Sequence, residues 1–138
     1  MSPEAQRIAI AEACGTLIFE PDGDMICAHN DSFENLQESD DAFGRTEFEA
    51  ALELLKDSPN SLPDYLNDLN AMHEAESYQL EKVGWEFQCG YLLNLREVGI
   101  RRRKGCNAVQ VDFWLMFATA AQRAEAFLRT IGKWDDTP

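Results

Sequence analysis

The sequence lacks a long hydrophobic run, because none of its apolar stretches approaches the roughly 18 uninterrupted residues that a membrane span needs. Its first residues, Met1–Glu4, also lack the basic patch and apolar core of a secretory signal peptide. We therefore expect a soluble protein of the cytoplasm. The 138 residues are 45% apolar and 10% aromatic, which is enough for one folded domain with its own core.

Motifs of catalysis and of cofactor binding are missing as well. The four cysteines, at positions 14, 27, 89 and 106, include no CxxC pair, so they predict reduced thiols rather than zinc ligands or a redox couple. The sequence contains no glycine-rich phosphate loop and no serine in a nucleophile elbow, and it has only two histidines. We expect a protein that is not an enzyme and that uses neither a cofactor nor a metal.

Basic residues are scarce in the first half of the chain. Residues 1–76 contain 18 acidic residues against Arg7, Arg45 and Lys56, a net charge of −15, whereas residues 77–138 have a net charge of +2. Such a field repels nucleic acids and anionic lipids, which bind proteins largely through basic side chains. It attracts a protein with a basic surface, and we expect a partner of this kind. A role in solubility alone is the alternative.

Capping residues and apolar spacing predict the helices. Ser2 and Pro3 are typical of a helix start, and Gly15 is typical of a helix end. Further helices are predicted at residues 46–57, 64–80 and 119–132.

Alternation and turn residues predict the strands. The β-prone runs 16–20 and 25–29 flank a turn of proline, aspartate and glycine, so they predict a hairpin. Residues 30–45 are polar and acidic without a period, which predicts a surface loop. Apolar residues alternate most clearly over 109–117, which predicts a strand covered on both faces.

Three segments carry a family resemblance. The central one is Pro63–Glu76, PDYLNDLNAMHEAE, and the last is Ala118–Trp134, ATAAQRAEAFLRTIGKW. These resemble the central motif and the C-terminal end of the phage ABA sandwich domain family, and Arg7–Gly15 resembles its N-terminal helix. The family occurs in bacteriophages and prophages, is largely uncharacterised and is named for a layered α/β/α fold. The resemblance implies a phage or prophage origin, and it supplies no catalytic residues.

Residues 82–98 fit two secondary structures. Alternating apolar residues such as Phe87, Cys89 and Tyr91 indicate a strand, whereas the spacing of Val83, Phe87, Tyr91, Leu95 and Val98 indicates a helix. Because the segment after the central motif tends to be helical in the family, the resemblance favours a helix.

The elements and the resemblance together predict the fold class. We expect a single α/β (α+β) domain over residues 1–138, with a small, largely antiparallel sheet layered with helices as an α/β/α sandwich. The sequence departs from the family over residues 16–45, so we expect the hairpin and the acidic loop to be a variable insert.

A group of potential metal ligands lies within the helix predicted at 64–80. Asp64 and Asp68 are four residues apart, and His73 and Glu76 are three apart, so each pair shares a helix face. A metal site of the bundle type needs matching ligands from a second helix, and the sequence offers none. We expect Asp64 to favour the helix dipole, and Asp68 and Glu76 to be solvated.

Two charged segments are candidate binding sites. The acidic loop supplies the partner-binding candidates, with Phe33, Leu36 and Phe43 spaced among them as apolar anchors: Asp31, Glu34, Glu38, Asp40 and Asp41. The basic run supplies anion-binding candidates for the alternative: Arg101, Arg102, Arg103 and Lys104. Either segment can also be an ordinary solvated surface.

The first functional hypothesis is a non-catalytic phage accessory protein that binds a host factor, most naturally an anti-defence inhibitor acting in the bacterial cytoplasm through its acidic surface. The alternative is an oligomeric binder that sequesters an anionic nucleotide signal with the basic run. A third hypothesis is a structural protein associated with the virion. The sequence leaves open whether the chain forms a homo-oligomer.

Overall fold

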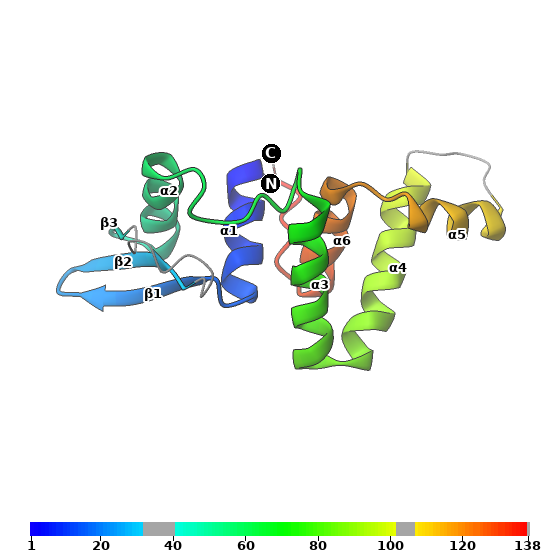
Figure 1. Cartoon of the computed structure of the whole chain (residues 1–138), viewed down its shortest axis with the longest axis horizontal. Coiled ribbons are helices and arrows are strands. Elements are labelled where there is room, and N and C mark those ends of the chain that lie inside the picture. The colour runs from blue at the N-terminus through cyan, green and yellow to red at the C-terminus, as the bar shows by residue number, and fades with distance from the viewer. Residues whose placement is uncertain (32–40, 102–106, 138) are drawn as a thin grey trace. The chain divides into compact units, whose positions relative to one another are not determined.

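The computed structural model describes residues 1–31, 41–101 and 107–137, which form six helices and one three-stranded antiparallel sheet (Figure 1). This confirms the predicted α+β class with its small antiparallel sheet. The chain divides into two compact units. We call Ser2–Asp64 the acidic unit, and Tyr65–Pro138 together with Met1 the helical unit.

The acidic unit begins with helix α1, Pro3–Ala13. The Ser2 hydroxyl accepts a hydrogen bond from the backbone nitrogen of Ala5 at 3.1 Å, and Pro3 occupies the first turn, where no intrahelical donor is needed. Gly15 follows the helix at a φ of 72°, a conformation that favours glycine. Both predicted ends of this helix are therefore confirmed.

The predicted hairpin is confirmed, with strand β1 at Leu17–Asp22 and β2 at Met25–Asn30. A third strand, β3 at Ala42–Gly44, pairs antiparallel with β2. The prediction of a loop throughout 30–45 is thus wrong at residues 42–44, because a run of three residues is too short to show a period of two. Residues 32–40 of that prediction lie outside the described residues.

One face of the sheet packs on helix α2, Glu47–Asp57 (Figure 1). Strand register places Ala28 opposite Ala42 on this face, and both are buried. At Gly44 the helix comes so close that a Cβ atom would lie 2.5 Å from the backbone nitrogen of Ala50. The Thr46 hydroxyl caps α2 by accepting from the Glu49 nitrogen at 3.1 Å, so the helix predicted at 46–57 is confirmed.

The helical unit contains four helices. They are α3 at Leu69–Val83, α4 at Trp85–Arg101, α5 at Ala108–Met116 and α6 at Ala120–Thr130. The Phe127 ring of α6 packs edge-on against Phe87 of α4, with 5.6 Å between ring centroids. At Gly90 of α4 a Cβ atom would lie 3.3 Å from the Thr130 methyl group, so α4 and α6 approach closely there.

The helix favoured for residues 82–98 is confirmed from Trp85 onward, whereas Val83 is exposed and is the last residue of α3. The other four residues of the predicted stripe are buried: Phe87, Tyr91, Leu95 and Val98. The helix predicted at 119–132 is also confirmed. The Thr119 hydroxyl and the Gln122 side chain each accept from the other residue's backbone nitrogen, and Gly132 follows the helix at a φ of 72°.

The helix predicted to start at residue 64 begins instead at Leu69. Asp68 is its N-cap, because its carboxylate accepts from the Asn70 nitrogen at 2.9 Å. Asp64 therefore lies outside the helix. Aspartate is common both in the first turn of a helix and at the N-cap. Pro63 favoured a helix start beside Asp64, whereas the structure uses Asp68 as the cap.

The strand predicted at 109–117 is wrong, because this segment forms helix α5. Seven of the nine residues of α5 are apolar, so an alternating pattern and a helical pattern fit equally well. The deciding local feature is a capping box that the alternation concealed. The Asn107 side chain accepts from the Gln110 nitrogen at 2.9 Å, and the Gln110 side chain accepts from the Asn107 nitrogen at 3.0 Å.

Candidate functional site

The surface of the acidic unit carries acidic side chains on α1, α2 and β1 and in the connections between its elements, whereas β2 and β3 contain none. The sequence of this unit has fifteen acidic and three basic residues, a net charge of −12. Eleven of the acidic residues are described and exposed: Glu4, Glu12, Glu20, Asp22, Asp24, Asp31, Asp41, Glu47, Glu49, Glu53 and Asp57. The unit therefore presents a field of one sign to solvent.

Arg7, one of the three bases, contacts backbone carbonyls inside the acidic unit. Its Nε donates to the Pro63 carbonyl at 2.7 Å, and its Nη2 donates to the carbonyls of Pro59, at 2.7 Å, and Leu62. These bonds attach α1 to the segment that follows α2. Arg45 and Lys56 are exposed, and two cations do not balance the acidic surface.

The structure describes only two of the five predicted partner-binding residues. Asp31 and Asp41 are both exposed, and the Asp31 backbone nitrogen donates to the Thr16 carbonyl at 2.9 Å. Glu34, Glu38 and Asp40 lie outside the described residues, as do the predicted anchors Phe33 and Leu36.

The sheet face opposite α2 combines apolar and acidic side chains. Strand register and alternation place Cys27, Phe43 and Met25 on this face, together with Glu20 and Asp22. Phe43 and Met25 are exposed, as are both carboxylates. We call this the open sheet face. It is an exposed apolar patch with a negatively charged border, which is the composition of a protein-contact surface rather than of a reaction centre.

Cys27 is a poor nucleophile in this setting. Its burial raises the pKa of the thiol, and the negative charges of Asp41, Glu20 and Asp22 raise it further. A thiol with a raised pKa stays protonated near neutral pH, so the acidic surround suppresses cysteine chemistry at this face.

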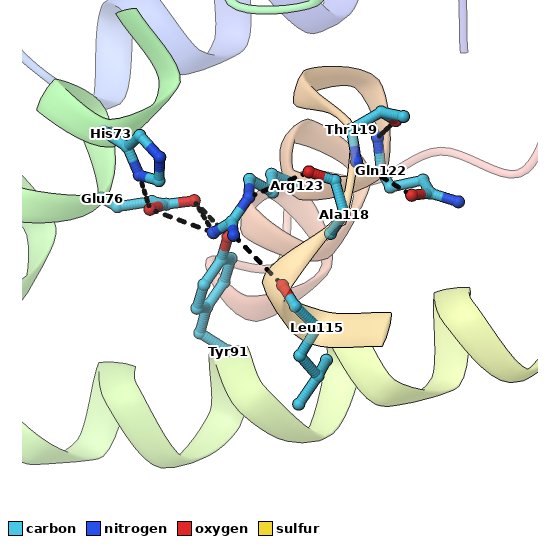
Figure 2. Close-up of polar contacts among 8 residues, drawn as sticks. All are labelled: His73, Glu76, Tyr91, Leu115, Ala118, Thr119, Gln122 and Arg123. Carbon is cyan, nitrogen blue, oxygen red and sulfur yellow. Dashed lines mark hydrogen bonds and ion pairs between the residues drawn. The ribbon is translucent and has the colours of Figure 1, made fainter. Parts of the chain in front are cut away.

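In the helical unit, Glu76 of α3 is the centre of a polar cluster (Figure 2). Arg123 of α6 donates from Nη1 to both Glu76 oxygens, at 3.1 and 3.5 Å, and the Tyr91 hydroxyl of α4 donates to Oε1. His73 Nδ1 lies 3.0 Å from Oε2. Arg123 also donates to the Leu115 carbonyl at 3.2 Å and to the Ala118 carbonyl at 3.3 Å. One carboxylate thus joins three helices.

The protonation behaviour of this cluster follows from its charges. Burial raises the pKa of Tyr91, and the adjacent Glu76 carboxylate raises it further by charge and by hydrogen bonding. Burial is the largest single influence on the pKa of Arg123 and lowers it, but the charges and hydrogen bonds of Glu76 and Tyr91 together outweigh burial, so the net shift is upward. Tyr91 therefore stays a neutral donor and Arg123 stays a cation, so the cluster holds its protons rather than exchanging them.

The potential metal ligands of the sequence are brought together only in part. His73 and Glu76 do lie together, but Asp64 is outside the helix and Asp68 is a cap. The cation beside Glu76 is the guanidinium of Arg123, whose Nη1 lies 3.1 Å from Oε1. Within residues 1–31, 41–101 and 107–137, no group of three or more histidine, cysteine, aspartate or glutamate side chains could hold a metal ion.

Sequence reasoning missed Arg123 and the role of Tyr91. Tyr91 lies in an apolar stripe and Arg123 lies 47 residues after Glu76, so no local pattern links the three. The structure describes even less of the basic run than of the acidic loop. Helix α4 ends at Arg101, and Arg102, Arg103 and Lys104 lie outside the described residues.

Comparison with known proteins identifies no relative, since no family model, curated protein or solved structure matches the chain. The resemblance to the phage ABA sandwich domain family therefore stays a prediction from the sequence. None of the helices in the described ranges has both the length and the apolar character that a membrane span requires.

Proposed function

We propose that the chain is a non-catalytic phage accessory protein that acts in the bacterial cytoplasm by binding a host protein, as an inhibitor of host defence, through the surface of the acidic unit. The observation that carries the proposal is the charge of this unit, −12 over Ser2–Asp64, with eleven exposed carboxylates in its described part.

The charge favours a protein partner with a basic surface. A field of one sign accelerates encounter with a surface of the opposite sign and repels nucleic acid, whose phosphates carry the same charge as this unit. The charge of Arg7 is already counted in this total, and its guanidinium donates to three carbonyl oxygens and not to a carboxylate in these bonds.

The open sheet face supplies contacts that charge alone does not. Long-range attraction sets the association rate, whereas buried apolar anchors set the lifetime of a complex. Phe43 and Met25 are exposed apolar side chains on this face, next to Glu20 and Asp22. A partner that buries Phe43 while its basic residues face the two carboxylates would use both effects.

The phage part of the proposal rests on the family resemblance of Pro63–Glu76 and Ala118–Trp134, and the anti-defence part rests on that resemblance together with the acidic charge. The non-catalytic part rests on the chemistry of the described residues. The polar cluster around Glu76 is closed by internal partners, and the raised pKa of the Cys27 thiol keeps it protonated near neutral pH.

The test is a pull-down of the tagged full-length chain from bacterial lysate at low and at high salt, with bound proteins identified by mass spectrometry. The proposal predicts a near-stoichiometric host protein with a basic surface that elutes as salt rises, because screening weakens exposed charge pairs. A variant with Glu34, Glu38, Asp40 and Asp41 changed to lysine is expected to lose this protein.

Two outcomes contradict the proposal. One is full partner capture and full activity in the charge-reversed variant. The other is a clean, partner-free oligomer that carries a phosphate-bearing small molecule through purification, which is the result expected of a nucleotide binder.

A further inference from the structure

Helix α5 presents an apolar stripe that no described residue covers. Val109, Phe113, Met116 and Phe117 follow the spacing i, i+4, i+7, i+8, so they share one side of the helix. Val109 is 77% exposed and Met116 is 73% exposed, and both phenylalanines are more than half exposed. A helix that is apolar on nearly every side is stable in proteins when its outer side is buried as well.

The outer side of α4 repeats this pattern. Trp85, Cys89, Leu92 and Leu93 have the same i, i+4, i+7, i+8 spacing, and all four are exposed. Trp85 is 72% exposed and Leu93 is 66% exposed. The opposite side of α4 faces the core of the helical unit, so this stripe is not the helix's own packing side.

An ion pair joins the two stripes. Arg96, which continues the α4 stripe one turn beyond Leu92, donates to the Asp112 carboxylate of α5 at 2.9 Å. Asp112 lies one turn from Met116 on α5. Figure 1 shows α5 at the end of α4, away from α3. We call the eight apolar residues of the two stripes the α4–α5 surface.

The size of the α4–α5 surface matches that of a protein interface. Side chains of these types at these exposures leave about 100 Å² each in solvent, or on the order of 800 Å² for the eight. A standard interface buries about 800 Å² per partner, and exposed apolar patches of this extent mark interaction sites.

We propose that the α4–α5 surface docks a second copy of the chain, with the two α4 helices antiparallel. The charges of the helical unit favour a second copy as the binding partner. The helical unit has a net charge of only −1, so two helical units approach each other without strong repulsion. Glu86 lies near the start of α4 and Arg96 near its end, so antiparallel packing brings Arg96 of each copy opposite Glu86 of the other.

The test is the mass of the full-length chain in solution, measured by light scattering and by sedimentation over a range of concentrations. The expected species has twice the 15.6 kDa of one chain. The variants Leu93→Asp and Phe113→Asp are expected to weaken the dimer roughly thirtyfold or more each, since each places a charge in the centre of an apolar interface. Both residues are more than half exposed in one copy, so circular dichroism and the melting temperature should show a folded chain.

The matched control is Phe48→Asp on α2, which is also an exposed phenylalanine changed to aspartate but lies in the acidic unit. It is expected to stay dimeric. In a Cys106→Ser background, Cys89 is the one cysteine of the helical unit, and a short bis-maleimide is expected to link two chains through it.

Three results would overturn the proposal. The first is a wild-type chain that stays monomeric at all concentrations, including one that binds anionic vesicles instead. The second is a dimer whose dissociation constant is unchanged in Leu93→Asp and Phe113→Asp, because the interface would then lie elsewhere. The third is a dimer that Cys89 does not cross-link.

Discussion

The acidic unit and the helical unit each direct an arginine inward, but they use it differently. Arg7 binds three backbone carbonyls, whereas Arg123 binds a carboxylate and two carbonyls. In the helical unit charges are paired with one another, as in Glu76–Arg123 and Glu125–Arg129. In the acidic unit the carboxylates outnumber the cations five to one, so most of their charge remains available to a partner.

The two units also differ in what their exposed apolar residues border. On the open sheet face, Phe43 and Met25 lie among carboxylates of one sign. On the α4–α5 surface, the charges beside the apolar stripes are of both signs, as in Arg96 and Asp112. A surface of one sign suits a partner of the opposite sign, and a surface of both signs suits a copy of itself.

The largest expected effect of a single substitution is at Arg123. Arg123→Met leaves the Glu76 carboxylate largely buried without its cation, and we expect a loss of about 3 kcal/mol in the free energy of unfolding. Urea denaturation followed by circular dichroism measures it. The control Lys82→Met removes an exposed lysine 5.7 Å above the Tyr78 ring, and it should cost less than about 1 kcal/mol. Equal losses in the two variants would show that the cluster does not tie the helices together.

The second-largest loss of stability is expected where strand β3 approaches helix α2 in the acidic unit. Gly44→Ala places a methyl group 2.5 Å from the Ala50 nitrogen, so we expect a loss of about 2 kcal/mol. Gly99→Ala is the matched control, because its methyl group meets no atom of the described residues within 4 Å and alanine is the better helix former. Thermal unfolding should show opposite signs for the two variants. A stabilising Gly44→Ala would contradict the packing of α2 on β3.

The alkaline stability of the helical unit depends on Tyr91. Because its pKa is raised in the folded chain, Tyr91 stabilises the fold fully below the unfolded value of about 10, and this contribution is lost as pH rises above it. Tyr91→Phe is expected to cost about 1 kcal/mol at neutral pH and to flatten the fall in stability above pH 10. Urea melts at several alkaline pH values provide the measurement. The exposed Tyr78→Phe should leave the slope as in the wild type, and a Tyr91→Phe slope equal to it would refute the role of Glu76.

Losses as small as that of Tyr91→Phe at neutral pH are expected at the two threonine caps, one in each unit. Thr46→Ala and Thr119→Ala each remove one hydrogen bond to a helix N-terminus and are expected to cost about 1 kcal/mol. Hydrogen exchange should accelerate at the start of α2 in the first variant and at the start of α6 in the second. Unchanged exchange in both would mean that these ends are held by other contacts.

These elements show which features could be predicted from the sequence. The caps at Ser2, Thr46 and Thr119 and the turn between β1 and β2 were predictable, because each depends on a few adjacent residues. Helix α5 was not, since its residues are apolar on all sides and carry no distinguishing period.

The candidate sites were less predictable than the fold. The excess of acid in the first part of the chain is a property of composition, so it could be counted directly. The pairing of Glu76 with Arg123 depends on how α3 and α6 pack, so no local sequence pattern could predict it. The α4–α5 surface could not be predicted, because the sequence indicated a strand at 109–117 where the structure has helix α5.

The measurement that tests the central claim most directly is the association rate of the captured partner with two charge-matched variants. One carries Asp31→Lys and Asp41→Lys in the acidic unit, and the other carries Glu74→Lys and Glu81→Lys in the helical unit; all four residues are exposed. We predict that the first variant associates at least about tenfold more slowly at low salt, while the second stays close to wild type. Equal slowing in both would show that total charge matters rather than the surface of the acidic unit, and would contradict the account.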